Sequence, residues 1–271
     1  MLKSSSLRNN PWVQAPLCKD VEYELHKLKP NYYRRGSGEA TQELELAISK
    51  HREWVSPIVD LKKFTHAYIT SGATEAINHW RLTERRPWQF FKGDYKYPQI
   101  LSGNGHEVEK LRPNDVLYVS NPRCHDGNFD DFAMITNPVI LDCAYVGATY
   151  IKKINIPINT EQIMFSFSKG WGLIGQRCGL VYTKEPHPSL EPLKQVECYN
   201  YSTAPIINMI MNKFALDEMY NLYKDRQKKI CEIYDLKSSD TYFIATTDNV
   251  YYKRRRRVNN IARVCLTEEF E

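Results

Sequence analysis

Two spacings of apolar residues recur along this chain, and each predicts a different kind of element. Short runs rich in β-branched and aromatic residues predict strands. These runs occupy residues 64–70, 88–97 (a short strand with its turn), 115–120, 139–142, 164–168 and 180–182. Apolar residues three and four positions apart predict helices, which we expect at 21–28, 39–54 and 204–233, with a further helix starting near 71.

The ends of these strands indicate where a functional site would lie. Several apolar strands end in polar residues, and helical segments separate some of them, which is typical of an α/β sheet with its site at the strand ends. The pattern changes after Tyr182, where prolines interrupt residues 186–192. The helical stretch that follows and a β-rich stretch over 241–266 predict a smaller C-terminal domain.

The composition is that of an ordinary globular protein. The chain has 271 residues, of which 42% are apolar, which excludes a disordered chain and a small disulfide-held scaffold. Its 7 cysteines include no CxxC pair, so we expect free thiols and a cytoplasmic location. No stretch reaches the roughly 18 apolar residues of a membrane span, and the N-terminus has no signal-peptide core, so no membrane partner is expected.

The net charge of +5 is modest, and much of it lies in one basic run at residues 253–257. Such a run is typical of a solvated hairpin or loop. The alternative is a contact with a phosphate-rich partner, such as nucleic acid or another polyanion.

The stretch with the clearest chemical content is residues 164–182. An alternating strand leads into Lys169, and a loop with Gly172, Gly175 and Gly179 around Arg177 follows. A lysine held by a strand at the edge of a glycine-rich loop is placed for chemistry. Taken alone, such a residue is by default a solvated loop lysine.

Two further stretches carry polar residues at element ends. Asp142 ends one strand, and Tyr145 follows it closely. Residues 71–77 join a strand to a helix through a small-residue turn, so that backbone N–H groups and the helix dipole point at one spot, which suits a phosphate. The alternative for this turn is an ordinary helix cap by Ser71 or Thr74.

Together these stretches resemble the fold type I pyridoxal-phosphate (PLP) enzymes, specifically the class I/II aminotransferases. The family's lysine motif is matched by residues 166–169 with the glycines and Arg177, its ring-binding motif by residues 142–145, and its phosphate turn by residues 71–76. The matches occur in the family's order, and a weaker likeness extends from about Asn9 to Arg263.

The resemblance implies an architecture. It is a mixed, mostly parallel sheet sandwiched by helices, with a small α+β C-terminal domain. Residues 1–30 would form an N-terminal arm and part of the small domain, residues 31–192 the large cofactor-binding domain, and residues 193–271 the small domain. The chain would be a shortened member of the family.

The resemblance also implies roles for the matched residues. Lys169 would form a Schiff base with the cofactor and then act as general base, Asp142 would keep the ring nitrogen protonated, and Tyr145 would hydrogen-bond the ring hydroxyl. The phosphate would be held by the turn and by nearby donors. These residues are Gly72, Ala73, Thr74, Ser166, Ser168 and Arg177.

Three further matches rest on shorter stretches. Tyr33 resembles the tyrosine that reaches the phosphate of a neighbouring subunit, which would make the enzyme a homodimer with its site at the subunit interface. Tyr97, or alternatively Tyr95, falls where the family places the aromatic residue that stacks on the cofactor ring. Arg263 resembles the arginine that grips the substrate carboxylate.

One loop departs from the family pattern. The family has an asparagine that hydrogen-bonds the ring hydroxyl, whereas residues 120–127 read SNPRCHDG, which puts Cys124 at that position. Either Asn121 takes the role in a shifted register, or the contact is lost. Cys124 and His125 could form a nucleophile pair or ligate a metal, but without further ligands we interpret them as loop residues and expect no metal.

The function implied is that of a PLP-dependent aminotransferase acting on an amino acid and a small carbonyl compound. A lyase or decarboxylase using the same site is the first alternative. The second is a protein that keeps the fold as a non-catalytic binding module.

Overall fold

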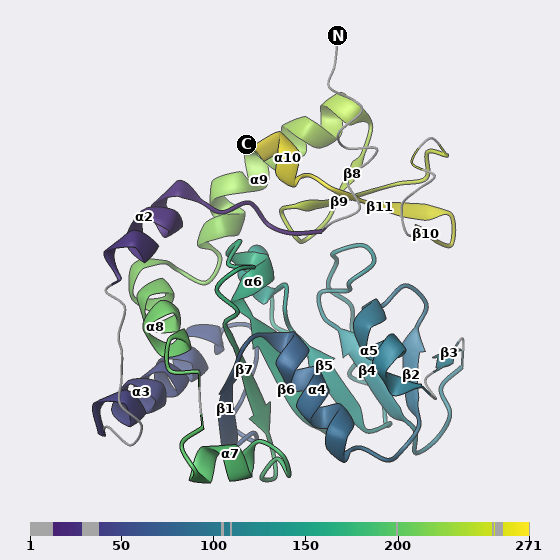
Figure 1. The fold of residues 1–271 in the computed structure, drawn as a ribbon. Coiled ribbons are helices and arrows are strands. Elements are labelled where there is room, and N and C mark those ends of the chain that lie inside the picture. The colour runs from purple at the N-terminus through teal and green to yellow at the C-terminus, as the bar shows by residue number, and fades with distance from the viewer. Residues whose placement is uncertain are drawn as a thin grey trace.

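The structure, a computed structural model, describes residues 13–28, 38–103, 106–108, 110–198, 200–250, 252 and 257–270. Its centre is a seven-stranded sheet with the strand order β1-β7-β6-β5-β4-β2-β3 (Figure 1). The bounds of the strands are β1 His66–Thr70, β2 Trp88–Phe91, β3 His106–Val108, β4 Val116–Ser120, β5 Val139–Asp142, β6 Thr160–Ser166 and β7 Gly179–Thr183.

The central sheet is mixed and mostly parallel, as expected. Strand β7 runs antiparallel to β1 and to β6, and the pairs β2–β3, β2–β4, β4–β5 and β5–β6 are parallel. Because the parallel strands β4, β5 and β6 end side by side, Ser120, Asp142 and Ser166 meet at one edge of the sheet.

Helices cover both faces of this sheet. Alternate residues of a strand face opposite sides, and on β6 Met164 packs in a cluster with Trp80 of α4 (Ala73–Thr83), whereas Phe165 packs in the larger core with Leu44 of α3 (Gly38–Val55). Helix α8 (Thr203–Lys213) lies beside α3. The remaining short elements are α5 (Lys96–Ser102), η1 (Val146–Ala148) and α7 (Glu191–Gln195).

A second sheet is formed by the C-terminal part of the chain. It is antiparallel, with the order β10-β11-β9-β8, and it lies past the ends of the central strands (Figure 1). Its strands are β8 Lys237–Ser238, β9 Ile244–Thr247, β10 Arg257–Val258 and β11 Ile261–Cys265, and α2 (Lys19–Lys27), α9 (Glu218–Tyr234) and α10 (Thr267–Phe270) complete the described elements. In the described part of the chain, no helix combines the length and the apolar character needed to cross a bilayer.

Most expected elements are present, but three expectations were wrong in detail. The strand expected over 164–168 ends at Ser166, because the Ser166 hydroxyl accepts a hydrogen bond from the Ser168 N–H at 3.2 Å and starts the one-turn helix α6 (Phe167–Gly170). The stretch 204–233 is two helices, because the backbone becomes extended at Phe214. Tyr97, expected in a strand and turn, lies in α5.

The expected domain boundaries at 30/31 and 192/193 stay predictions. Helix α8 lies within the expected small domain but packs on α3 and β1 of the large layer. Between β4 and β5, residues 121–138 contain no helix, as expected from the short spacing.

Candidate active site

A cavity of about 260 Å³ lies where β4, β5 and β6 end. Its wall combines residues from the strand ends with the first turn of α4, helix α6 and the loop before β7. The lining residues are Ala73, Thr74, Tyr95, Ser120, Pro122, Cys124, Asp142, Ala144, Tyr145, Ser166, Ser168, Lys169, Ile174 and Arg177.

Among the described residues, Lys169 is the only lysine in this wall. It lies in α6, and its Nζ donates a hydrogen bond to the Val13 carbonyl at 2.5 Å. Burial lowers the pKa of the Lys169 amine, and the Arg263 and Arg177 guanidinium groups nearby lower it further. A lowered pKa increases the fraction of neutral amine at physiological pH, and the neutral amine is the nucleophilic form.

Asp142 is the only carboxylate that the described part of the chain contributes to the wall. Its Oδ2 accepts a hydrogen bond from the Tyr118 hydroxyl, and its Oδ1 accepts one from the Ala144 N–H at 2.9 Å. Burial raises the pKa of Asp142 to about 6, and these hydrogen bonds limit the rise. At neutral pH the group is a buried carboxylate that would be stabilised by a cationic N–H on a bound ligand.

Gly72, Arg177 and two serines form a cradle at one end of the cavity. Arg177 Nη1 donates to Ser168 Oγ at 3.2 Å. A Cβ added at Gly72 would lie 3.0 Å from Arg177 Nη2 and 3.6 Å from Ser166 Oγ. Because residue 72 is glycine, a space remains open between the Arg177 guanidinium and the serine hydroxyl groups. Helix α4 begins directly after Gly72, so its N-terminus borders the same space.

The sheet brings this cradle together. Strand β1 pairs with β7 so that Thr70 lies opposite Gly179, which places the residues after β1 beside those before β7. A Cβ on Gly179 would come within 2.6 Å of the Gly72 Cα, so both positions need glycine. The α4 amides at Ala73 and Thr74 belong to the first turn, where N–H groups have no partner within the helix. Fixed N–H donors with Arg177 form a site suited to a phosphate.

The helix cap considered from the sequence is absent. The N-cap residue of α4 is Gly72, with φ +85° and no side-chain hydrogen bond to the helix. Instead, the Glu75 carboxylate accepts a hydrogen bond from the Ser71 N–H.

Tyr145 and Cys124 line the cavity near the second sheet. The Tyr145 hydroxyl lies 3.8 Å from Cys124 Sγ, and its ring packs edge-on against Phe243. Burial raises the pKa of Tyr145 well above its usual value, so the phenol is protonated and can donate. Arg263, expected to hold a substrate, donates from Nη1 to the Cys124 carbonyl and contacts its Sγ at 3.3 Å.

Several expected residues lie elsewhere. Asn121 is buried, and its side-chain amide pairs with the backbone of Asp130, accepting from the N–H at 3.2 Å and donating to the carbonyl at 2.9 Å. Cys124, not Asn121, therefore reaches the cavity wall. Tyr97 donates to Asn78 at 2.6 Å outside the wall, and Tyr95 lines the cavity in its place. Tyr33 and most of the basic run at 253–257 lie outside the described residues.

The sequence pattern did not point to a group of polar residues at this wall, in which Asp94 holds Tyr95 and Ser120. Asp94 is buried and accepts from the backbone N–H groups of Tyr95 at 2.7 Å and of Ser120 at 3.1 Å, and from the Ser120 hydroxyl. Burial raises the pKa of Asp94. Because Ser120 pairs with Asp142 in the parallel sheet, aligning the ends of the expected strands would have found Ser120. No local signal marked Tyr118 or Asp94.

Among the described residues no group of three or more His, Cys, Asp or Glu side chains could hold a metal ion. Within the same part of the chain His125 pairs with Asp126 at 3.2 Å. All seven cysteines are described and unpaired.

No protein-family model matches the chain, and no curated protein matches its sequence. Solved structures do match. Histidinol-phosphate aminotransferase of Sinorhizobium meliloti, in complex with pyridoxal-5'-phosphate, is 14% identical over 94% of this chain and 85% of that one, with a TM-score of 0.65. Alanine aminotransferase of Pyrococcus furiosus is 17% identical over 86% and 73%, with a TM-score of 0.63.

The likeness is not confined to aminotransferases. L-threonine-O-3-phosphate decarboxylase of Porphyromonas gingivalis is 15% identical over 95% of this chain and 97% of that one, with a TM-score of 0.64. At these identities the likeness establishes the fold. The chain has the PLP fold type I architecture that these enzymes share, as the sequence resemblance implied.

Proposed function

We propose that this chain is a PLP-dependent aminotransferase that moves an amino group between an amino acid and a 2-oxo acid or another carbonyl compound. The observation that carries the proposal is the position of Lys169 and Asp142 in one buried cavity, with a cradle for an anion formed by Gly72 and Arg177. When bound, PLP supplies a carbonyl that condenses with amines and a ring that takes up electrons from a substrate's bonds.

The residues present fit this cofactor. Arg177, the serine hydroxyls at 166 and 168 and the first amides of α4 would hold the phosphate. The Asp142 carboxylate would accept a hydrogen bond from the ring N–H and keep it protonated. The Tyr145 hydroxyl, neutral at physiological pH, would donate to the ring oxygen.

Lys169 would have two roles. Its amine, with a lowered pKa, would attach the cofactor covalently. The same amine, when it is not attached to the cofactor, would take the proton from the substrate Cα and return it elsewhere, and its lowered pKa favours the neutral form that this role needs. Arg263, which donates to the Cys124 carbonyl, would attract the substrate carboxylate, and Tyr95 would contact the cofactor ring.

The same site could instead serve decarboxylation or elimination. The likeness to a threonine-phosphate decarboxylase at a TM-score of 0.64 favours this as the second candidate. Lys169 and Asp142 would keep their roles, and the orientation of the substrate would decide which bond breaks.

Two further proposals concern the setting of the enzyme. We propose a homodimer with the site at the subunit interface, as implied by the resemblance at Tyr33. We also propose that the enzyme acts in the cytoplasm, where its free thiols would stay reduced. A polyanionic partner for the basic run at 253–257 is a separate proposal that rests on charge alone.

Attachment of the cofactor is the first test. The purified chain is mixed with PLP, reduced with borohydride and digested, and the peptides are analysed by mass spectrometry. We expect the reduced cofactor on Lys169 and no labelling at this site in Lys169→Ala. Labelling spread over surface lysines, with Lys169 unmodified, would contradict the proposal.

The reaction type is tested on the loaded protein with a panel of amino acids. Formation of the 2-oxo acid, with the cofactor converted to its amine form, is expected for an aminotransferase. Release of carbon dioxide or ammonia, with the cofactor unchanged, would favour the second candidate. Attachment without turnover of any amino acid would favour a non-catalytic binding module.

A further inference from the structure

Asp94 is a second buried acid, and it lies behind the wall of the candidate active site. It follows β2 and is 5% exposed. A tight turn precedes it, in which the Asp94 N–H donates to the Phe91 carbonyl at 3.1 Å and Gly93 has φ +86°. A Cβ on Gly93 would lie 2.2 Å from Val258 Cγ2 of the second sheet and 2.9 Å from His125 Cβ. The turn therefore needs glycine, and its position is fixed from two sides.

The Asp94 carboxylate joins this turn to the end of β4. Its Oδ1 accepts hydrogen bonds from the Tyr95 N–H at 2.7 Å and from the Ser120 hydroxyl, and its Oδ2 accepts one from the Ser120 N–H at 3.1 Å. Tyr95 and Ser120 both line the cavity. Ser120 also lies opposite Asp142 in the pairing of β4 with β5, and paired strands are about 4.8 Å apart. Asp94 thus fixes two wall residues, one of them beside Asp142.

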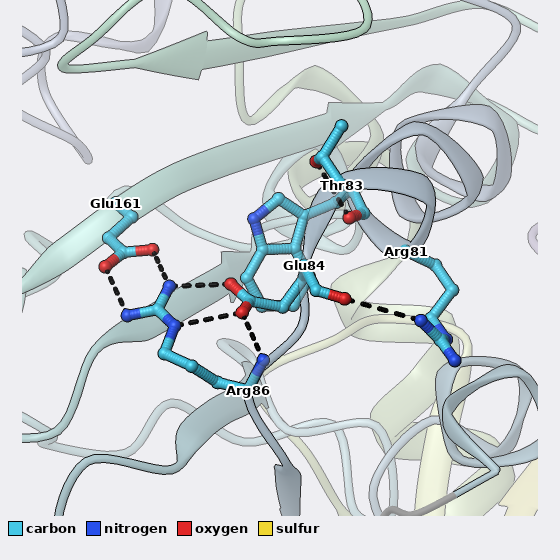
Figure 2. A network of polar contacts seen from close by, with 6 residues as sticks. Arg81, Thr83, Glu84, Arg86 and Glu161 are labelled. Carbon is cyan, nitrogen blue, oxygen red and sulfur yellow. Dashed lines mark hydrogen bonds and ion pairs between the residues drawn. The ribbon is translucent and has the colours of Figure 1, made fainter.

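A buried carboxylate is usually paired with a cation, because its charge has lost the stabilisation by water. Glu84 follows this rule. Figure 2 shows its carboxylate 2.6 Å from Arg86 Nη2, which also pairs with Glu161 at 2.7 Å. In the part of the chain that the structure describes, no lysine, arginine or histidine forms an ion pair with Asp94 or with Asp142. The active-site region therefore holds two negative charges without a cationic partner.

These two carboxylates repel each other. Burial raises the pKa of Asp142, and the charge of Asp94 raises it further, whereas the hydrogen bond from Tyr118 and the charge of Lys169 lower it. Burial also raises the pKa of Asp94, whereas its three hydrogen-bond donors and the charge of His125 lower it. A cationic group placed beside Asp142 would interact favourably with both carboxylates.

We propose that Asp94 is a positioning residue for the reaction: it holds Tyr95 and Ser120 in the wall, and its charge acts through Asp142 on the cationic N–H of the bound ring. This inference rests on the proposed function, since the ring is that of PLP. Asp94 does not line the cavity, so it would not touch the cofactor. Its charge strengthens the hold of Asp142 on the ring proton.

Asp94→Asn in the cofactor-free protein tests the effect of the charge. The amide keeps the shape of the side chain and one acceptor oxygen but removes the negative charge. We expect the pKa of Asp142 to fall below that of the wild type. Carbon-13 NMR titration of the carboxyl groups measures this pKa, and the Asp142 signal is identified by its loss in Asp142→Asn. An unchanged pKa in a folded Asp94→Asn variant would overturn the proposal.

Glu84→Gln is the matched control for removal of a buried charge. Arg86 keeps Glu161 as its partner in this variant (Figure 2). Glu84 is not among the groups that act on Asp142, so the pKa of Asp142 should stay at its wild-type value. A fall as large as that in Asp94→Asn would mean that the effect is not specific to Asp94, which would overturn the proposal.

Ser120→Ala separates the charge of Asp94 from its hydrogen bonds. The variant removes the hydroxyl that donates to Asp94 but keeps both negative charges. It should lower the melting temperature and leave the pKa of Asp142 near its wild-type value. If Ser120→Ala and Asp94→Asn lowered that pKa equally, the attachment of the turn to β4 would explain both, and the role of the charge would be refuted.

The PLP-loaded protein gives the second readout. Asp94→Asn should lower kcat by about tenfold, the factor that one pKa unit of interaction represents, and should leave KM for the amino acid nearly unchanged. The absorbance of the bound cofactor at neutral pH should shift toward the form with an unprotonated ring nitrogen. Full turnover with an unchanged spectrum would overturn the role of Asp94 and leave the proposed function standing. A wild type that does not attach PLP to Lys169 would overturn both.

Discussion

Asp142 is a buried acid whose pKa is raised by its surroundings in the candidate active site. Its carboxylate is buried at the end of β5, and burial raises its pKa from 3.8 to about 6. An acid with a raised pKa binds protons more tightly in the folded state, so stability falls as the pH rises from about 4 to about 6. The shift corresponds to about 3 kcal/mol of lost stability at neutral pH. A cationic group on a bound ligand would offset this loss of folding stability by pairing with the buried carboxylate.

Replacing this carboxylate by an amide tests that account. In the cofactor-free protein, Asp142→Asn removes the buried charge but keeps a single acceptor oxygen, so one of the two hydrogen bonds from Tyr118 and the Ala144 N–H is lost, which costs less than the charge does. We expect the variant to be at least as stable as the wild type at pH 7.5, and less dependent on pH between 4 and 6. Urea unfolding at several pH values measures both.

Although Asp142→Asn should keep or raise the stability of the protein, it should lower the catalytic activity. An amide cannot keep a ring nitrogen protonated, so turnover should fall by about 100-fold or more, as for the loss of a charged group that acts on the reacting system. A stable variant with full turnover would contradict the role proposed for Asp142.

At the scale of elements, the junction of β1 and α4 is the feature on which the cradle depends. Gly72 has φ +85° and ψ 176°, a conformation that is essentially restricted to glycine. It also lies against Gly179 at the start of β7. The junction therefore fixes both the start of α4 and the position of Arg177.

Gly72→Ala should disturb both functions of this junction. The added Cβ would lie 3.0 Å from Arg177 Nη2 in a strained backbone, and we expect a loss of about 1–3 kcal/mol of stability. Affinity for PLP should fall as well, because Arg177 must move. Thermal unfolding and absorbance titration with PLP measure the two effects.

Gly175→Ala in the neighbouring loop is the matched control. A Cβ there meets no atom within 4 Å, so stability should change by less than about 0.5 kcal/mol. Equal losses of stability and PLP affinity in Gly72→Ala and Gly175→Ala would contradict the special role that is proposed for Gly72 in the cradle.

At the scale of the whole molecule, the cavity is assembled from distant parts of the chain. Val13 of the N-terminal segment accepts from Lys169, and Gly172 packs against Pro16 and Leu17. Arg263 comes from the second sheet. The low pKa of Lys169 therefore depends on segments that are far apart in sequence.

This dependence can be measured through Lys169 itself. Arg263→Gln removes a positive charge near the amine but keeps an N–H donor for the Cys124 carbonyl, so the pKa of Lys169 should rise. Competitive acetylation of the cofactor-free protein over a range of pH, with the Lys169 peptide measured by mass spectrometry, gives that pKa.

Arg226→Gln provides the comparison. Arg226 donates to the Glu269 and Phe270 carbonyls at 2.6 Å each and does not act on Lys169, so the labelling profile should match that of the wild type. An unchanged profile in Arg263→Gln would mean that the charge of Arg263 does not contribute to the lowered pKa of Lys169.

The sequence by itself determined the features that depend only on residues close together along the chain. A lysine after a strand, an aspartate at a strand end and a glycine turn before a helix are local patterns, and the structure brings Lys169, Asp142 and Gly72 to one edge of the sheet. The fold class followed from the same strand and helix spacings and from the resemblance.

Tertiary structure alone decided which side chain at a given place faces the cavity. Tyr95 does and Tyr97 does not, because α5 begins at Lys96 and turns the second ring away. Asn121 is held by the Asp130 backbone, which leaves the wall to Cys124. Such contacts join residues far apart in the chain, and no local pattern records them.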